Sequence, residues 1–160
     1  MMHVIAGKAV AFKEVLSPDF KLYCEQIVSN AKALCSSLTG AGSRVVSGGT
    51  DNHLFLLSLV DRDITGKMAQ IALDRAGVTT NKNMVPFDPR KPMVTSGLRI
   101  GTPAVTTRGM REPEMAEIAG FIQRVLENPG DVNELDAVRE EVAALCRRFP
   151  LYTNHWAESD

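Results

Sequence analysis

The chain has 160 residues, of which 44% are hydrophobic and 23% are charged, as is usual for one globular domain with a hydrophobic core. The net charge of -1 argues against general nucleic-acid binding, and no apolar run is long enough to predict a membrane span. We therefore expect a cytoplasmic protein without a nucleic-acid or membrane partner. The three cysteines lack the spacing of metal ligands, so no metal site is predicted.

The first part of the chain predicts two helices and a hairpin. Residues 1–16 predict a short helix. Ser17 and Pro18 begin a longer helix that extends to about Thr39, because serine caps helices and proline fits the first helical position. Residues 44–47 and 53–60 predict two strands joined by a glycine-rich turn.

The second part predicts two more strands among three helices. We expect a helix capped by Thr65 and closed by Gly77, followed by a strand over residues 78–81. Residues 82–91 hold two prolines and predict a loop long enough to suspect a function, and a strand follows over 98–105. Two more helices are predicted, one from Arg111 and one over residues 132–149. This order of elements indicates an α+β fold, in which helices cover a small, mostly antiparallel sheet.

Arg99 is the unusual residue of the last predicted strand. Its neighbours Leu98 and Ile100 are apolar, so alternation directs them to one face and Arg99 to the other. Gly97 and Gly101 flank it without side chains that could block a ligand. If that face is covered, the guanidinium needs an anionic partner. A carboxylate would fit, because it can accept two parallel hydrogen bonds from the guanidinium. On a wet face Arg99 would be an ordinary surface charge, and the pattern alone leaves both interpretations open.

Four segments carry a resemblance to a known family. They read HVIAGKAVAFKEVL, VVSGGTDNHLFLLSLVD, TGKMAQIALDRAGVTTNKNMVPFDPRKPMVTSGLRIGTPAVTTRG and CRRFPLY, in that order along the chain. Together they resemble the C-terminal part of bacterial serine hydroxymethyltransferases, and the likeness extends to about Tyr152.

The resemblance implies the small C-terminal domain of the aspartate-aminotransferase type of pyridoxal-phosphate fold. Enzymes of this family transfer the hydroxymethyl carbon of serine to tetrahydrofolate, which gives glycine and 5,10-methylenetetrahydrofolate. The family motif makes Arg99 the residue that binds the amino-acid carboxylate. The folate contacts carry over to Asn83 and to Lys91, Pro92 and Met93, with Met93 standing where many relatives have an aromatic residue.

The resemblance also implies that the lysine that attaches pyridoxal phosphate is not in this sequence. We therefore assign no catalytic and no cofactor-binding residue, and we expect the chain alone to be inactive. Residues 1–16 are the expected helix leading from a large domain, 17–152 the small domain and 153–160 a loose tail. The intact enzyme is expected to be a homodimer or homotetramer, and an exposed apolar seam would favour self-association of the isolated chain.

Two other interpretations remain at this point. The chain could be a stand-alone, non-catalytic binding module, or part of another pyridoxal-phosphate enzyme of the same fold type, such as an aminotransferase or an aldolase. The NKN segment that contains Asn83 and the GGTDNH turn favour the hydroxymethyltransferase.

Overall fold

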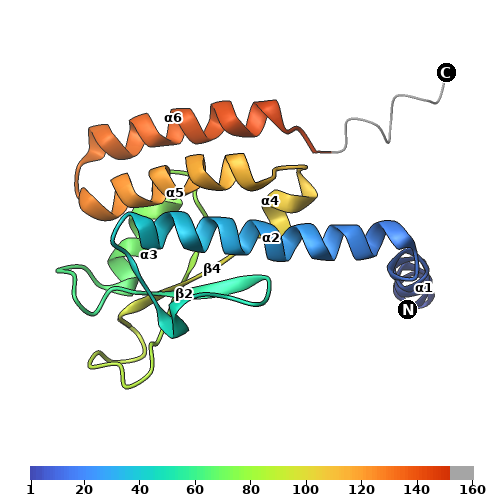
Figure 1. Cartoon of the computed structure of the whole chain (residues 1–160), viewed down its shortest axis with the longest axis horizontal. Helices are drawn as coiled ribbons and strands as arrows, with labels where there is room; N and C mark the ends of the chain where they lie inside the picture. Colours follow the sequence, from blue (N-terminus) through green and yellow to red (C-terminus); the bar gives the residue numbers. More distant parts are fainter. Residues whose placement is uncertain (152–160) are drawn as a thin grey trace.

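A computed structural model describes residues 1–151, which form an antiparallel four-stranded sheet with helices packed on one of its faces (Figure 1). The α+β class and the antiparallel sheet are thus confirmed. The tail predicted over 153–160 lies outside the described residues. No helix within residues 1–151 combines the length and apolar character that a membrane span requires.

Two helices begin the chain, as predicted. Helix α1 (Met2–Val15) has no buried residue and projects from the N-terminal end of α2 (Pro18–Gly40), away from the other helices (Figure 1). The Ser17 hydroxyl accepts a hydrogen bond from the Phe20 N–H at 3.3 Å, so the expected cap forms. Apolar residues at helical spacing bury the other end of α2 against the core: Ile27, Ala31, Leu34 and Leu38.

The sheet has the order β1-β2-β4-β3. Its strands are β1 (Arg44–Val45), β2 (Leu54–Ser58), β3 (Asn81–Asn83) and β4 (Gly97–Gly101). Strands β1 and β2 form the predicted hairpin, with Val45 opposite Leu57. All neighbouring strands are antiparallel.

The predicted ends of the first two strands are wrong. Residues 44–47 were expected as a strand, but β1 stops at Val45 because Ser47 and Gly48 take positive φ angles of 67° and 71° in the turn η1 (Val46–Gly48). The second strand, expected over 53–60, is limited to Leu54–Ser58.

The last two strands also differ from the prediction. Residues 78–80 are not a strand, because the Val78 N–H donates to the Leu73 carbonyl at 2.8 Å and so completes the end of the preceding helix. Strand β3 therefore starts at Asn81, and the loop starts at residue 84 rather than 82. The strand expected over 98–105 ends at Gly101, and Pro103 opens the unpredicted short helix α4 (Pro103–Thr107).

The remaining helices confirm the sequence pattern. Helix α3 (Gly66–Arg75) is capped by the Thr65 hydroxyl, which accepts from the Met68 N–H at 3.1 Å. Helices α5 (Glu112–Glu127) and α6 (Val132–Arg148) lie where they were expected. Helix α5 packs between α6 and α2, and the core lies between these helices and the sheet (Figure 1).

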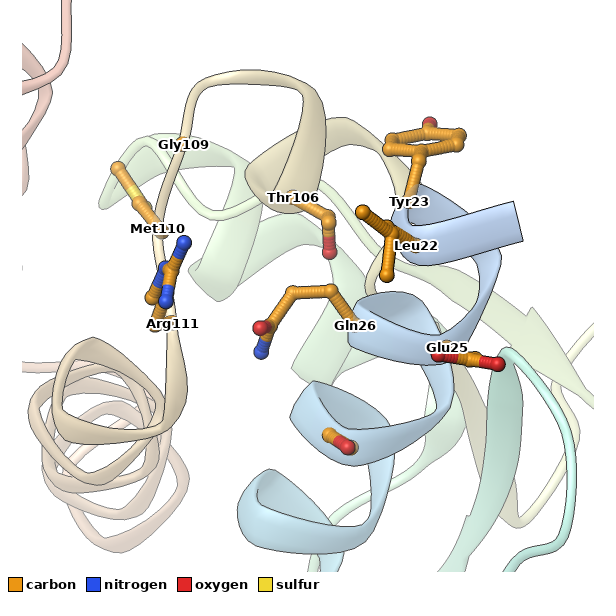
Figure 2. Close-up of a pocket in the computed structure, with 9 residues that line it drawn as sticks. Leu22, Tyr23, Glu25, Gln26, Thr106, Gly109, Met110 and Arg111 are labelled. Carbon is orange, nitrogen blue, oxygen red and sulfur yellow. The ribbon is translucent and has the colours of Figure 1, made fainter. Parts of the chain in front are cut away.

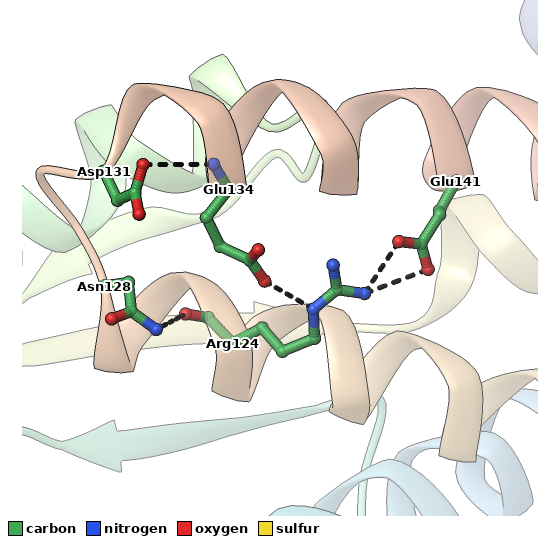
Figure 3. Close-up of polar contacts among 5 residues, drawn as sticks. All are labelled: Arg124, Asn128, Asp131, Glu134 and Glu141. Carbon is green, nitrogen blue, oxygen red and sulfur yellow. Dashed lines mark hydrogen bonds and ion pairs between the residues drawn. The ribbon is translucent and has the colours of Figure 1, made fainter.

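An ion network joins α5 to α6 (Figure 3). Arg124 of α5 donates from Nε to Glu134 at 2.6 Å and from Nη1 to Glu141 at 2.8 Å, both on α6. The hydrogen bond to Glu134, then that to Glu141, raises the pKa of Arg124. Asp131 caps α6 by accepting from the Asn133 and Glu134 N–H groups. The network fixes how α6 lies on α5.

Candidate functional site

The face of the sheet opposite the helices carries Arg99. Arg99 of β4 lies between Leu56 of β2 and Asn81 of β3, and residues directly opposite each other in an antiparallel sheet project to the same side. Leu98 and Ile100 are buried on the helix side, whereas Arg99 is exposed. The prediction that Arg99 faces away from its two apolar neighbours is confirmed.

The guanidinium of Arg99 has few partners within residues 1–151. Its Nη2 donates to the Asn81 Oδ1 at 3.3 Å, a bond to a neutral amide, and Arg99 belongs to none of the ion pairs of the described chain. An arginine has five N–H donors in a planar fork, so donors remain for a carboxylate. Gly101 leaves one flanking position of the same face open, whereas Gly97 on the other side is buried beneath Val85. The arrangement is suited to binding a planar anion.

Asn83, a predicted folate contact, lies on the same face as Arg99. It is opposite Gly97, two residues along the paired strands from the Arg99 and Asn81 pair. Its side-chain Nδ2 donates to the Met84 carbonyl at 2.8 Å. The structure therefore brings Arg99 and Asn83 to one surface.

Lys91, Pro92 and Met93, the other predicted folate contacts, lie on the loop between β3 and β4. All three are exposed, and 75% of Met93 is accessible. They are outside the sheet, so their position relative to Arg99 depends on how the loop is held.

Asp88 holds this loop, a role that the sequence pattern did not reveal. Its carboxylate accepts four hydrogen bonds: from the N–H groups of Val85, Arg90 and Ser96 at 3.2, 2.9 and 2.8 Å, and from the Ser96 hydroxyl at 2.6 Å. The side chain of Arg90 donates to the Ile64 carbonyl at 2.8 Å, just before α3. Both ends of the loop are thereby tied to the residue that precedes β4.

The pKa of Asp88 reflects these contacts. Partial burial would raise it, but the hydrogen bonds from Ser96, Arg90 and Val85 outweigh burial and lower the pKa of Asp88 from 3.8 to about 2. The ionised carboxylate is therefore the form that organises the loop.

This shift predicts a loss of stability in acid. Because the pKa of Asp88 is lower in the folded chain, its stabilising contribution is complete above about pH 4 and is lost as the pH falls towards 2. The wild type should be more stable than Asp88→Asn at pH 5, and the difference should shrink steadily between pH 4 and 2. Urea unfolding of both proteins across this range measures it; a difference that does not change with pH would contradict the assignment.

The paired positions of the sheet on the face of Arg99 hold no lysine. Lys82 is opposite Leu98 and so belongs to the helix side of the sheet. Residues 1–151 also contain no group of three His, Cys, Asp or Glu side chains placed to hold a metal ion.

A second concave region lies between α2 and the loop from α4 to α5 (Figure 2). This groove of about 540 Å³ is lined by Tyr23, Gln26, Thr106 and Arg111, among others. Three of its polar side chains are already hydrogen-bonded: the Tyr23 hydroxyl is 2.8 Å from that of Thr107, and Gln26 donates to the buried Asn30, which donates to Thr106 at 2.9 Å. The contacts of Tyr23 and Asn30 join α2 to α4, and we assign the groove no ligand.

The fold and the open sheet face define the class of the protein: a small α+β domain with an exposed arginine on the face of its sheet that the helices do not cover. The profile of the family described as serine hydroxymethyltransferase matches residues 1–122. The chain belongs to the serine hydroxymethyltransferase family, which confirms the resemblance seen in its motifs.

Several relatives support this assignment. The serine hydroxymethyltransferase of Myxococcus xanthus (strain DK1622) is 58% identical over 154 residues, which are 96% of this chain and 37% of the relative. Serine hydroxymethyltransferases of Halorhodospira halophila and Alkalilimnicola ehrlichii are 58% and 57% identical, over 95% of this chain and 36% of each relative. The chain thus spans just over a third of the length of these relatives.

Proposed function

We propose that this chain is the C-terminal small domain of a cytoplasmic, pyridoxal-phosphate-dependent serine hydroxymethyltransferase. The intact enzyme would interconvert serine and tetrahydrofolate with glycine and 5,10-methylenetetrahydrofolate. Family membership supports the reaction, and one structural observation supports the role of this chain: Arg99 stands on an open sheet face with a single bond to a neutral partner.

In this proposal Arg99 binds and orients the carboxylate of serine or glycine. Two parallel N–H···O bonds fix both the position and the plane of the carboxylate, which a single point charge cannot do. The substrate would be held beside the exposed Gly101, where the strand offers backbone but no side chain, because Val85 covers the position of Gly97. The bonds that react would then project away from the sheet, towards residues that this chain does not supply.

The folate cosubstrate is proposed to contact Asn83, Lys91, Pro92 and Met93. Asn83 shares the face of Arg99, and the loop with the other three is tied by Asp88 to the start of β4. An apolar pair, Pro92 and Met93, next to the Lys91 ammonium suits a flat ring system that carries carboxylates.

Pyridoxal phosphate, when bound, supplies the electron sink for the reaction. Its attachment lysine is proposed to lie in the part of the enzyme that corresponds to the remaining length of the relatives. The residues of this chain would bind and orient substrates, and we assign none of them to proton transfer or covalent catalysis.

Helix α1 supports the proposal that the domain works within a larger assembly. Its apolar side chains are exposed: Ile5 by 66%, Val10 by 59% and Phe12 by 68%. A helix with apolar residues around its surface is usually buried by a partner. We propose that residues 1–16 lead from the large domain and that 17–152 form the small domain of a homodimer or homotetramer.

Activity measurements test the proposal. The purified chain, mixed with pyridoxal phosphate, serine and tetrahydrofolate, should form no glycine, because binding a carboxylate without the electron sink does not weaken the bond to be broken. A chimera in which residues 1–152 replace the matching segment of the Myxococcus xanthus relative should regain activity, since the two sequences are 58% identical.

The isolated chain and the chimera serve as controls for each other, because they test different parts of the proposal. Turnover by the isolated chain at the rate of the intact relative would contradict the assignment of catalytic groups to the large domain. A chimera that folds and binds pyridoxal phosphate but forms no glycine from serine would contradict the proposed function itself.

A further inference from the structure

A cavity of about 240 Å³ lies inside the domain, on the helix side of the sheet. Its inner wall is apolar and buried, with Ile100 of β4, Phe121 and Ile122 of α5 and Leu145 of α6 each at most 8% exposed. The cavity therefore lies directly behind β4, the strand that carries Arg99. All of its lining residues belong to the described chain.

The outer side of the cavity is less enclosed. Val105 of α4 and Arg108, which follows α4, line it there together with Val142 and Cys146 of α6, and all four are half-buried. The Arg108 guanidinium is fixed by a hydrogen bond from Nη1 to the Phe149 carbonyl at 3.1 Å. Four other lining residues, Gly77, Thr79, Gly101 and Ala104, are exposed, so a small molecule can reach the apolar space from solvent.

Thr80 adds one polar group to this apolar wall. It is 5% exposed, and its hydroxyl has no hydrogen-bond partner within residues 1–151. Thr80 comes directly before β3 and is one of the residues that line the cavity. Buried hydroxyl groups are nearly always hydrogen-bonded, so a bound molecule that pairs with the Thr80 hydroxyl would satisfy this group.

We propose that the cavity binds a small, mostly apolar molecule with one hydroxyl group, of which phenol is the simplest aromatic member. An apolar cavity of about 150 Å³ holds a benzene ring, so the volume here is sufficient. The ring packs against Ile100, Phe121 and Ile122, and its hydroxyl pairs with the Thr80 Oγ1. This site does not depend on the proposed transferase function, because the chain contains all of it.

Nuclear magnetic resonance titration of the 160-residue chain tests this site, with phenol and benzene as probes. Both should cause saturable shifts of amide signals around the cavity, with contacts from the phenol ring to the methyl groups of Ile100 and Ile122. Thr80→Val keeps the shape but removes the hydroxyl, so it should weaken phenol binding about fivefold and leave benzene binding unchanged. Thr80→Ser, the matched control, should bind phenol as the wild type does.

Each result bears on the proposal. Because the Thr80 hydroxyl has no hydrogen-bond partner within residues 1–151, its removal should not unfold the protein, and dispersed spectra of both variants verify this. Shifts that never saturate, or ring contacts elsewhere on the surface, would overturn the site. An equal loss of phenol and benzene binding in Thr80→Val would overturn the pairing with the hydroxyl.

Discussion

Replacement of Arg99 in the active chimera is expected to raise the KM for serine, by roughly tenfold for Arg99→Lys and roughly a hundredfold for Arg99→Gln. Lysine keeps the charge but loses the two parallel hydrogen bonds, whereas glutamine loses the charge as well. The carboxylate is not the reacting group, so its contact is much the same in the ground state and the transition state. We therefore expect kcat to change less than KM. Steady-state kinetics with serine varied at saturating tetrahydrofolate measure both values.

Arg44→Lys is the matched control for this experiment. Arg44 is also exposed on the open face, at the edge strand β1, but its guanidinium is paired with Asp61 at 3.0 Å. Exposed pairs of this kind contribute little, so its replacement should leave the KM for serine within about twofold. A KM for serine that stays the same in Arg99→Gln would show that the carboxylate is bound elsewhere.

The sequence was a good guide to the helices because their ends carry local signals. Ser17 and Thr65 cap their helices through their own side chains, and such contacts involve residues three positions apart. Strand ends depended on less local causes. Strand β4 ended four residues earlier than apolar alternation suggested, because a helix packed against α2 begins at Pro103.

The candidate site shows the same division. Period-two alternation correctly predicted the direction of Arg99, since the pattern lies within one strand. That Asn83 shares the same face could not be predicted, because the expected strand over 78–81 left Asn83 in a loop. The role of Asp88 was also missed: its strongest partner, Ser96, is eight residues away across a loop whose shape has no regular period.

The sequence pattern also did not predict that α3 lies close to the start of β4. Disrupting this contact has the largest expected effect on the stability of the chain. Gly66 opens α3, and its N–H donates to the Thr95 carbonyl at 3.0 Å. A Cβ atom at Gly66 would overlap the Thr95 hydroxyl and lie 2.6 Å from the Gly97 carbonyl oxygen. The backbone at Gly97 cannot shift to relieve this overlap, because Val85 and the Asn83 carbonyl lie against it.

Gly66→Ala should therefore destabilise the chain by about 3 kcal/mol, although alanine favours helix formation. Gly120→Ala is the matched control: Gly120 lies within α5 with nothing near its Cβ position, so the same change should stabilise by about 0.5–1 kcal/mol. Urea unfolding of the two variants and the wild type measures the opposite signs. In the chimera, Gly66→Ala should also raise the KM for serine, because it displaces the start of β4 and with it Arg99. A gain of stability in both variants would show that α3 does not approach β4 closely. The contact between Gly66 and the start of β4 would then not be what positions Arg99.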